Sequence, residues 1–255
     1  MLDLARYRVA AQAAGIHSLC SVLVAALAAW VVFGVWYVYP YRELSGGREL
    51  FLLVVSVDVV CGPLLTFVLF NPKKPRKELW IDLGLVVLIQ LAALGYGIWT
   101  VWQARPLYLV HEVDRYKVIS APDVEAEALK ALPANLKPQL WAGPQTVAIR
   151  PPKNAEEHNK VLFEVAAGGR DYAERPEFYI PYDGAATLKS LLRAKPLSVF
   201  LQKQPNQQEA AQKLARDKGA DMAQWLYLPV IARQDWVAVL DKQGQIQGFL
   251  RGDGF

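Results

Sequence analysis

The chain has 255 residues, is 53% hydrophobic and carries a net charge of +4, but these averages combine two different halves. Residues 1–104 hold eight Lys and Arg and six Asp and Glu, so residues 105–255 hold 20 and 18 of them, the balance of a soluble domain. The even spread of these charges excludes the basic patch of a nucleic-acid-binding protein. At about 150 residues, this second half is long enough for one domain with its own core.

Three apolar stretches predict transmembrane helices at about residues 16–39, 50–70 and 81–104. An apolar run of about 18 or more residues indicates a membrane span, because ~20 residues at a rise of ~1.5 Å cross the hydrocarbon core. We therefore expect an integral membrane protein that contacts the lipid bilayer. Residues 1–104 would form its membrane domain, and residues 105–255 a soluble domain.

The distribution of basic residues predicts the orientation of these spans. Lys and Arg are retained on the cytoplasmic side of a membrane. The N-terminal tail and the loop NPKKPRKE (residues 71–78) are basic, whereas residues 41–49 balance two Arg with two Glu. The N-terminus is thus expected in the cytoplasm, and in a bacterium the second half would be periplasmic, behind the inner membrane. The first span is too long for an ordinary cleaved signal peptide.

The second half predicts an α+β domain with an antiparallel sheet covered by helices. Helices are expected at residues 154–166, with Asn154 as N-cap and Gly168-Gly169 as stop, and at residues 206–218, ending at Gly219. Alternating apolar residues on both sides of Asp241–Gly244 predict a closing hairpin. The strand-like segments are 107–119, 145–149, 178–182, 225–232, 235–240 and 245–250. Trp141, Trp225 and Trp236 are expected in the core of this domain, whose lack of cysteine excludes disulfides.

Asp58 is the most unusual residue of the predicted spans. It lies about eight residues into the second span, hence ~12 Å deep at helical rise. A carboxylate at that depth costs about 2.5–3.5 kcal/mol and usually faces protein or water rather than lipid. Gly62 follows one helical turn later, and Pro63 removes the backbone hydrogen bond to Val59, which should kink the helix.

The third span offers partners for Asp58. Gln90, Tyr96 and Gly97 lie within one arc of that helix, and Tyr96 has a depth similar to that of Asp58. A hydrogen bond from Tyr96, or one through Gln90, would satisfy the carboxyl, while glycines allow the two helices to approach closely. Three roles for Asp58 stay open: fastening the helices together, contact with a guest transmembrane helix, and a proton relay. The candidate partner-binding residues are Asp58, Gly62, Pro63, Gln90, Tyr96 and Gly97.

No catalytic or metal-binding motif is recognisable. His17, His111 and His158 are scattered, and the sequence has no HExxH, CxxC or GxSxG pattern. Gly168-Gly169 reads as a helix stop, because no strand–GxxxxGK–helix context surrounds it. The sequence therefore predicts a protein that is not an enzyme and that needs no metal or cofactor.

The segment DVVCGPLLTFVLFNPKKPRKELWIDLGLVVLIQLAALGYGIWTVWQARP, followed by HEVDRYKV, resembles the type IV pilin accessory proteins of the TfpX/TfpZ family. The resemblance extends over essentially the whole chain. One departure is His111, where an aromatic residue such as Phe is expected. The matching positions are Asp58, Gly62, Pro63, Glu78, Asp82, Gln90, Tyr96, Arg105, Pro106, Asp114 and Arg115.

This resemblance implies a chaperone-like inner-membrane protein that helps a particular major pilin accumulate or assemble. The implied partner is the pilin, with a hydrophobic stem helix bearing an acidic residue near its start, and a periplasmic head. Proteins of the pilus assembly platform are further candidate partners. The alternative is a membrane-anchored sensor with a periplasmic ligand-binding domain, disfavoured by the lack of a cytoplasmic output domain. A transferase acting on pilin would need more spans and a carboxylate site.

Overall fold

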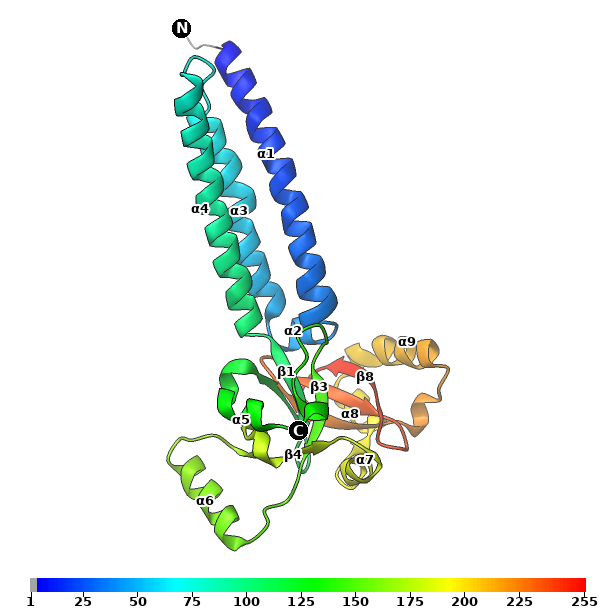
Figure 1. Cartoon of the computed structure of the whole chain (residues 1–255). Helices are drawn as coiled ribbons and strands as arrows, with labels where there is room; N and C mark the ends of the chain where they lie inside the picture. The colour runs from blue at the N-terminus through cyan, green and yellow to red at the C-terminus, as the bar shows by residue number, and fades with distance from the viewer. Residues whose placement is uncertain (1–3) are drawn as a thin grey trace. The chain divides into compact units, whose positions relative to one another are not determined.

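The computed structural model describes residues 4–255, which form two compact units (Figure 1). The helical bundle contains the residues up to Val38 together with Gly47–Gln103. The sheet domain contains Tyr39–Gly46 and Ala104–Phe255. The short connection between the first two spans thus belongs to the sheet domain, where the backbone N–H of Arg233 donates to the carbonyl of Leu44 (3.0 Å).

The bundle consists of three helices that are long and apolar enough to cross a membrane. They are α1 (Leu4–Val31, extended by a π-helical turn at Val32–Trp36), α3 (Gly47–Leu69) and α4 (Arg76–Gln103). Most of their large apolar side chains are exposed on the protein surface, as expected for helices that face lipid. The prediction of three long apolar helices is therefore confirmed.

Each helix begins before its apolar stretch. From Leu4 onward, the residues before the first apolar stretch are part of α1, and α4 begins at Arg76 inside the basic loop. Pro75 immediately precedes α4, and its carbonyl accepts a hydrogen bond from the backbone N–H of Leu79 (3.1 Å). In the middle of the bundle, α3 packs against both α1 and α4.

The sheet domain is built on one mixed sheet of eight strands. Its order is β4-β3-β1-β2-β6-β7-β8, and β5 pairs with β6. Neighbouring strands are antiparallel except for two parallel pairs, β1–β3 and β2–β6. The predicted antiparallel sheet is thus mostly confirmed, with these two pairs as the correction. The strands are β1 (Pro106–His111), β2 (Tyr116–Ser120), β3 (Gln145–Ile149), β4 (Tyr179–Pro181), β5 (Lys195–Pro196), β6 (Leu226–Ile231), β7 (Trp236–Leu240) and β8 (Ile246–Arg251).

The prediction of a single strand at residues 107–119 is wrong, because the segment folds back as the β1–β2 hairpin. The backbone N–H of Glu112 donates to the carbonyl of Arg115 (2.9 Å) and closes the turn. This turn contains neither glycine nor proline, the residues that usually mark a hairpin turn in a sequence. The sequence therefore lacked the residues that usually reveal a hairpin turn at this place.

The predicted closing hairpin is confirmed as β7 and β8. The Asp241 carboxylate accepts hydrogen bonds from the backbone N–H groups of Gln243 and Gln245, both at 2.9 Å. Gly244 adopts a left-handed φ of +76°, a conformation that glycine reaches without steric cost. Local turn chemistry therefore specifies this element.

Alanine at Gly244 is expected to destabilise the sheet domain more than alanine at Gly168. Both glycines have left-handed φ angles (76° and 84°), so both substitutions carry a backbone penalty of about 1–2 kcal/mol. A Cβ at Gly244 would also overlap the backbone carbonyl of Thr187, whereas a Cβ at Gly168 meets open space. Thermal unfolding of the purified full-length variants measures the difference, and equal losses in Tm would contradict it.

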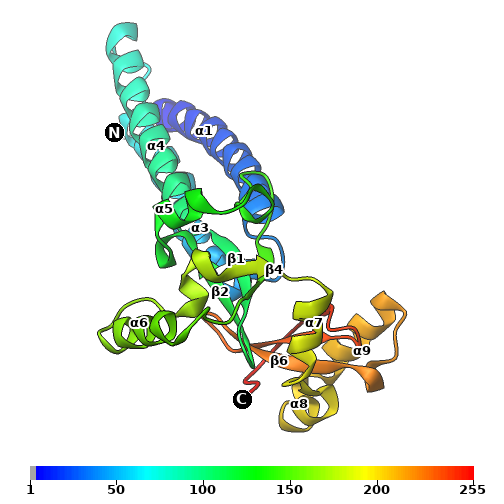
Figure 2. The same ribbon diagram turned by 60° about the horizontal axis from the view of Figure 1, so that its bottom comes forward.

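Helices and short helical turns cover the sheet over two separate cores. Phe200 of α8, Ala211 of α9 and Trp225 belong to one core, and Tyr108, Leu132 and Val147 to the other. Figure 2 shows α7, α8 and α9 at one end of the domain and α6 at the other. The predicted helices at 154–166 and 206–218 are confirmed as α6 and α9. The helices are α2 (Tyr41–Leu44), α5 (Ala126–Ala131), α6 (Ala155–Ala166), α7 (Gly184–Leu191), α8 (Leu197–Lys203) and α9 (Gln208–Lys218).

Candidate functional site

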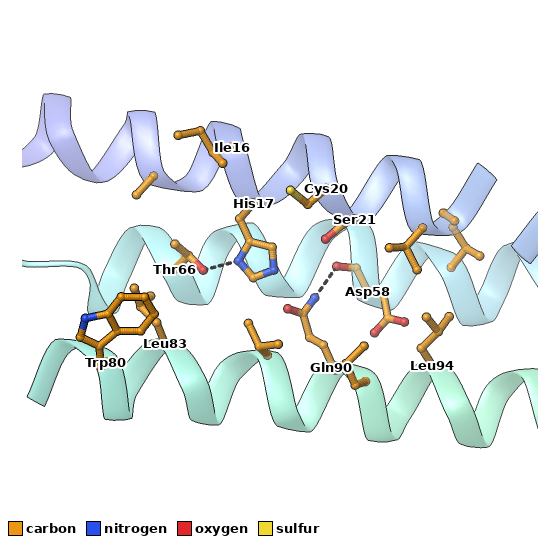
Figure 3. Close-up of a pocket in the computed structure, with 16 residues that line it drawn as sticks. Ile16, His17, Cys20, Ser21, Asp58, Thr66, Trp80, Leu83, Gln90 and Leu94 are labelled. Carbon is orange, nitrogen blue, oxygen red and sulfur yellow. Dashed lines mark hydrogen bonds between the residues drawn. The ribbon is translucent and has the colours of Figure 1, made fainter. Parts of the chain in front are cut away.

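A groove with a volume of about 480 Å³ runs along the helical bundle (Figure 3). It exists because α1 and α4 both pack on α3 and leave space between them. Its walls are side chains of α1 between Ala13 and Ala25, of α3 between Val55 and Thr66, and of α4 between Trp80 and Leu94. We call this space the bundle groove. A second, apolar hollow of about 240 Å³ lies farther along α1 and ends at Trp36.

The first polar group in the bundle groove links α1 to α3. His17 Nδ1 lies 2.5 Å from Thr66 Oγ1, and Thr66 is buried. Ser21 lines the groove one turn beyond His17. Sequence reasoning missed the contribution of α1, although His17 and Ser21 lie at i and i+4, the spacing that places two polar side chains on one helix face.

The second polar group is Asp58 on α3. Gln90 Nε2 donates to the Asp58 backbone oxygen at 2.9 Å, so the predicted link through Gln90 uses the carbonyl and not the carboxyl (Figure 3). The carboxyl oxygen Oδ2 is buried and has no hydrogen-bond partner among the described residues. A buried oxygen of this kind requires a donor, since an unsatisfied buried polar group is costly. Within residues 4–255, no hydrogen bond links Oδ2 of Asp58 to another helix.

The predicted glycine contacts between α3 and α4 are confirmed. A Cβ at Gly62 would overlap the Gln90 amide, and a Cβ at Gly97 would overlap the Val54 side chain. The absence of side chains at these two positions lets the helices approach closely. Pro63 is half-buried, and α3 continues through it to Leu69.

The predicted hydrogen bond between Tyr96 and Asp58 is wrong. The Tyr96 side chain is 69% exposed and packs against Trp99, with 5.8 Å between ring centroids. A helix turns by about 100° per residue, so Gly97 lies within about 20° of Gln90 while Tyr96 lies about 120° away. Of the six predicted residues, Asp58, Gly62 and Gln90 therefore lie next to one another. Gly97 lies in the same α3–α4 interface, and Tyr96 lies outside the groove.

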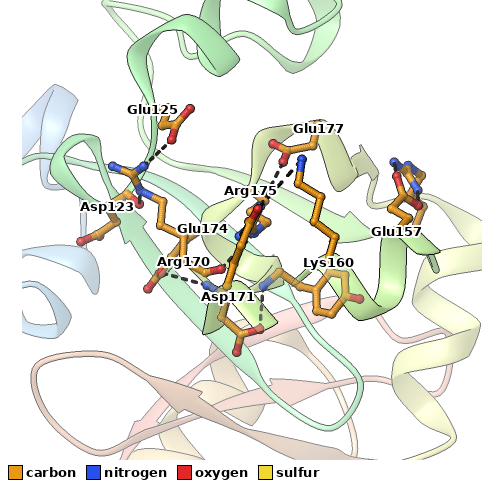
Figure 4. A network of polar contacts seen from close by, with 12 residues as sticks. Asp123, Glu125, Glu157, Lys160, Arg170, Asp171, Glu174, Arg175 and Glu177 are labelled. Carbon is orange, nitrogen blue, oxygen red and sulfur yellow. Dashed lines mark hydrogen bonds and ion pairs between the residues drawn. The ribbon is translucent and has the colours of Figure 1, made fainter. Parts of the chain in front are cut away.

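The sheet domain carries a network of ion pairs beside a hollow of about 660 Å³ (Figure 4). Arg175 pairs with Glu164 of α6 at 2.5 Å, and Arg170 pairs with Glu125 at 2.8 Å. Both guanidinium groups form ion pairs with carboxylates of the same domain, so the network fastens α6 to its neighbours. No group of three or more His, Cys, Asp or Glu within residues 4–255 is arranged to hold a metal ion.

These features define a protein with three helices that are long and apolar enough to cross a membrane, a groove between them that contains polar groups, and a domain with a mixed sheet and helices. A family model described as "Fimbrial assembly protein FimB" matches residues 5–46. The chain is 36% identical over 254 residues to "Fimbrial assembly protein, serogroup I" of Dichelobacter nodosus, and 35% identical over 254 residues to the serogroup E1 protein. Each match covers 98% of both chains. The chain therefore belongs to the fimbrial assembly protein FimB family.

A further relative, the Dichelobacter nodosus protein of serogroups C1 and C2, is 45% identical over 124 residues, covering 49% of this chain and 95% of that protein. No solved structure matches the chain. Family membership confirms a role in fimbrial assembly, the class that the sequence resemblance implied. The narrower assignment to the TfpX/TfpZ family stays a prediction.

Proposed function

We propose that this protein is a non-enzymatic, chaperone-like assembly factor that holds the transmembrane stem of a type IV pilin in the bundle groove before assembly. The observation that carries the proposal is the buried Asp58 oxygen, which has no hydrogen-bond donor among the described residues, in an otherwise largely apolar groove between helices. A guest helix is the occupant that supplies both an apolar surface and a donor at this depth.

Together, the bundle groove and the second hollow extend over a length that fits a membrane-spanning helix. The stretch of α1 from Ala13 to Trp36 lines both hollows and is about 35 Å long at helical rise. This length matches the hydrocarbon core of ~30 Å. Ser21, Ala25 and Ala28 are small residues along this stretch and permit close packing of a second helix.

The proposed orientation places the N-terminus in the cytoplasm and the sheet domain in the periplasm, beside the inner membrane. The pilin head is then on the side of the sheet domain, and the start of its stem is near the basic end of the bundle. His17 lies toward that end and is the groove residue best placed to meet an acidic residue near the start of the stem. The relatives are distinguished by serogroup, which fits an accessory protein that serves a particular pilin.

Photocrosslinking of the full-length protein in membranes that contain the cognate pilin tests the proposal. Benzoylphenylalanine at Leu91 or Val24, which line the groove, should crosslink to the pilin stem. The matched controls Leu88 and Leu23 are also exposed but do not line the groove, and they should give little product. Equal yields from both pairs would contradict binding in the groove.

Asp58→Leu is expected to lower the crosslinking yield about tenfold or more. A hydrogen bond to a charged group contributes about 1.5–3 kcal/mol, and 1.4 kcal/mol corresponds to a factor of ten in affinity. The Gln90 bond to the backbone at position 58 survives this substitution, so the detergent-solubilised protein should keep its Tm. An unchanged yield would remove Asp58 from the binding site, and a large loss of Tm would indicate a structural role.

A further inference from the structure

Of the three tryptophans in the sheet domain, Trp141 is exposed and the other two are buried. Trp225 and Trp236 are 3% and 4% exposed, as predicted for core residues, whereas Trp141 is 71% exposed. The neighbouring Leu140 is 49% exposed. The prediction that Trp141 belongs to the core is therefore wrong. Exposed apolar side chains are common on folded domains, so the place of this pair in the fold decides what it can meet.

The sheet topology places this pair close to the residues that follow the last apolar helix in the chain. The last helical residue of α4 is Gln103, and β1 begins three residues later at Pro106. Strand β3 pairs in parallel with β1, with Gln145 opposite Tyr108, so the two strands begin at the same end of the sheet. The loop of residues 137–144 leads into β3 at that end. We call it the Trp141 loop.

Contacts within the sheet domain confirm this placement. The Trp141 loop and the first residues of β1 line a common hollow of about 150 Å³, to which Arg105, Pro106, Lys137 and Ala142 contribute. Arg105 is two residues beyond α4, hence within about 7 Å of the end of that helix along the chain. The loop therefore lies beside the first residues of the chain after its last apolar helix.

We propose that the Trp141 loop inserts into the headgroup region of the bilayer next to the end of α4. Tryptophan is enriched at this level because its ring is apolar and its indole N–H is a hydrogen-bond donor. Lys137 adds positive charge beside the pair, which suits lipid phosphates. The partner is thus a lipid surface, and the inference is independent of the pilin.

Single-cysteine labelling tests the insertion in the full-length protein. Its only two cysteines, Cys20 and Cys61, lie in the bundle, so Cys20→Ala and Cys61→Ala give a background without thiols. An environment-sensitive fluorophore is attached at Trp141→Cys, and in a second variant at Leu140→Cys. The matched control is Phe163→Cys on α6, which follows the opposite end of β3 and is 76% exposed.

In nanodiscs of phosphatidylethanolamine and phosphatidylglycerol, without pilin, labels at 140 and 141 should show blue-shifted emission. Lipids carrying a nitroxide near the headgroup should quench them several-fold more strongly than the label at 163. If aqueous iodide quenched the labels at 140 and 141 as strongly as the label at 163, the proposal would be overturned. Protection from iodide without quenching by the nitroxide lipids would also overturn it, because protein and not lipid would then cover the loop.

Discussion

Gly62→Leu is expected to abolish pilin capture and to loosen the bundle, because position 62 has no room for a side chain. Gly62 is buried on α3 against the Gln90 amide of α4. Leucine would displace Gln90, break its hydrogen bond to the Asp58 backbone and force the helices apart. Overpacking costs about 1–3 kcal/mol, and an interhelical hydrogen bond in a membrane adds about 0.6 kcal/mol.

Gly95→Leu on α4 is the matched control for this substitution. A Cβ at Gly95 meets nothing within 4 Å, so the same increase in volume falls on the lipid-facing surface. The measurements are the Tm of the solubilised full-length protein and the amount of pilin and pili in an expressing strain. Gly62→Leu should lower all three, and Gly95→Leu should leave them close to wild type. Similar effects of both variants would show that the α3–α4 contact does not control the groove.

The stability of the sheet domain is expected to fall between pH 6.5 and pH 4 because of His111. This side chain is 5% exposed at the end of β1, beside the rings of Tyr116 and Tyr182, and its Nε2 has no partner among the described residues. Burial lowers the pKa of His111 from 6.5 to about 4; Asp114 raises this pKa and Lys189 lowers it further. In this pH window the unfolded chain binds a proton that the folded chain does not.

Acid therefore favours the unfolded state across the window, and stability increases with pH until it levels off above pH 6.5. The difference between the two limits is about 3 kcal/mol, from 1.36 kcal/mol for each unit of pKa. His111→Phe removes the titrating group and an unsatisfied nitrogen while keeping an aromatic ring. Thermal unfolding of the full-length protein, followed by near-ultraviolet circular dichroism between about pH 4 and pH 7.5, should therefore show a flatter profile. A profile as steep as that of wild type would assign the acid sensitivity to other groups.

Composition and short-range patterns were sufficient for the three spans, the closing hairpin and helices α6 and α9. Asn154 illustrates this: its side chain accepts a hydrogen bond from the Glu157 backbone N–H (2.8 Å) and caps α6 as predicted. These elements were predictable because apolar stretches, helix caps and turns depend on residues that are close together in the sequence. Gly62 and Gly97 were also recognisable, since a 3.6-residue period places Gly97 and Gln90 on one helix face.

The bundle groove, by contrast, depends on how three helices pack. The α3 helix contacts both neighbours while α1 and α4 leave a space, and no pattern within one helix specifies that arrangement. Packing also directs the Gln90 amide to the Asp58 carbonyl, leaves Asp58 Oδ2 without a donor among the described residues, and turns Tyr96 outward. The parallel pairing of β1 and β3 brings the Trp141 loop beside Arg105, 36 residues earlier in the chain. Contacts between distant segments form only when the whole chain folds, because local preferences do not select among the ways that apolar faces can be joined.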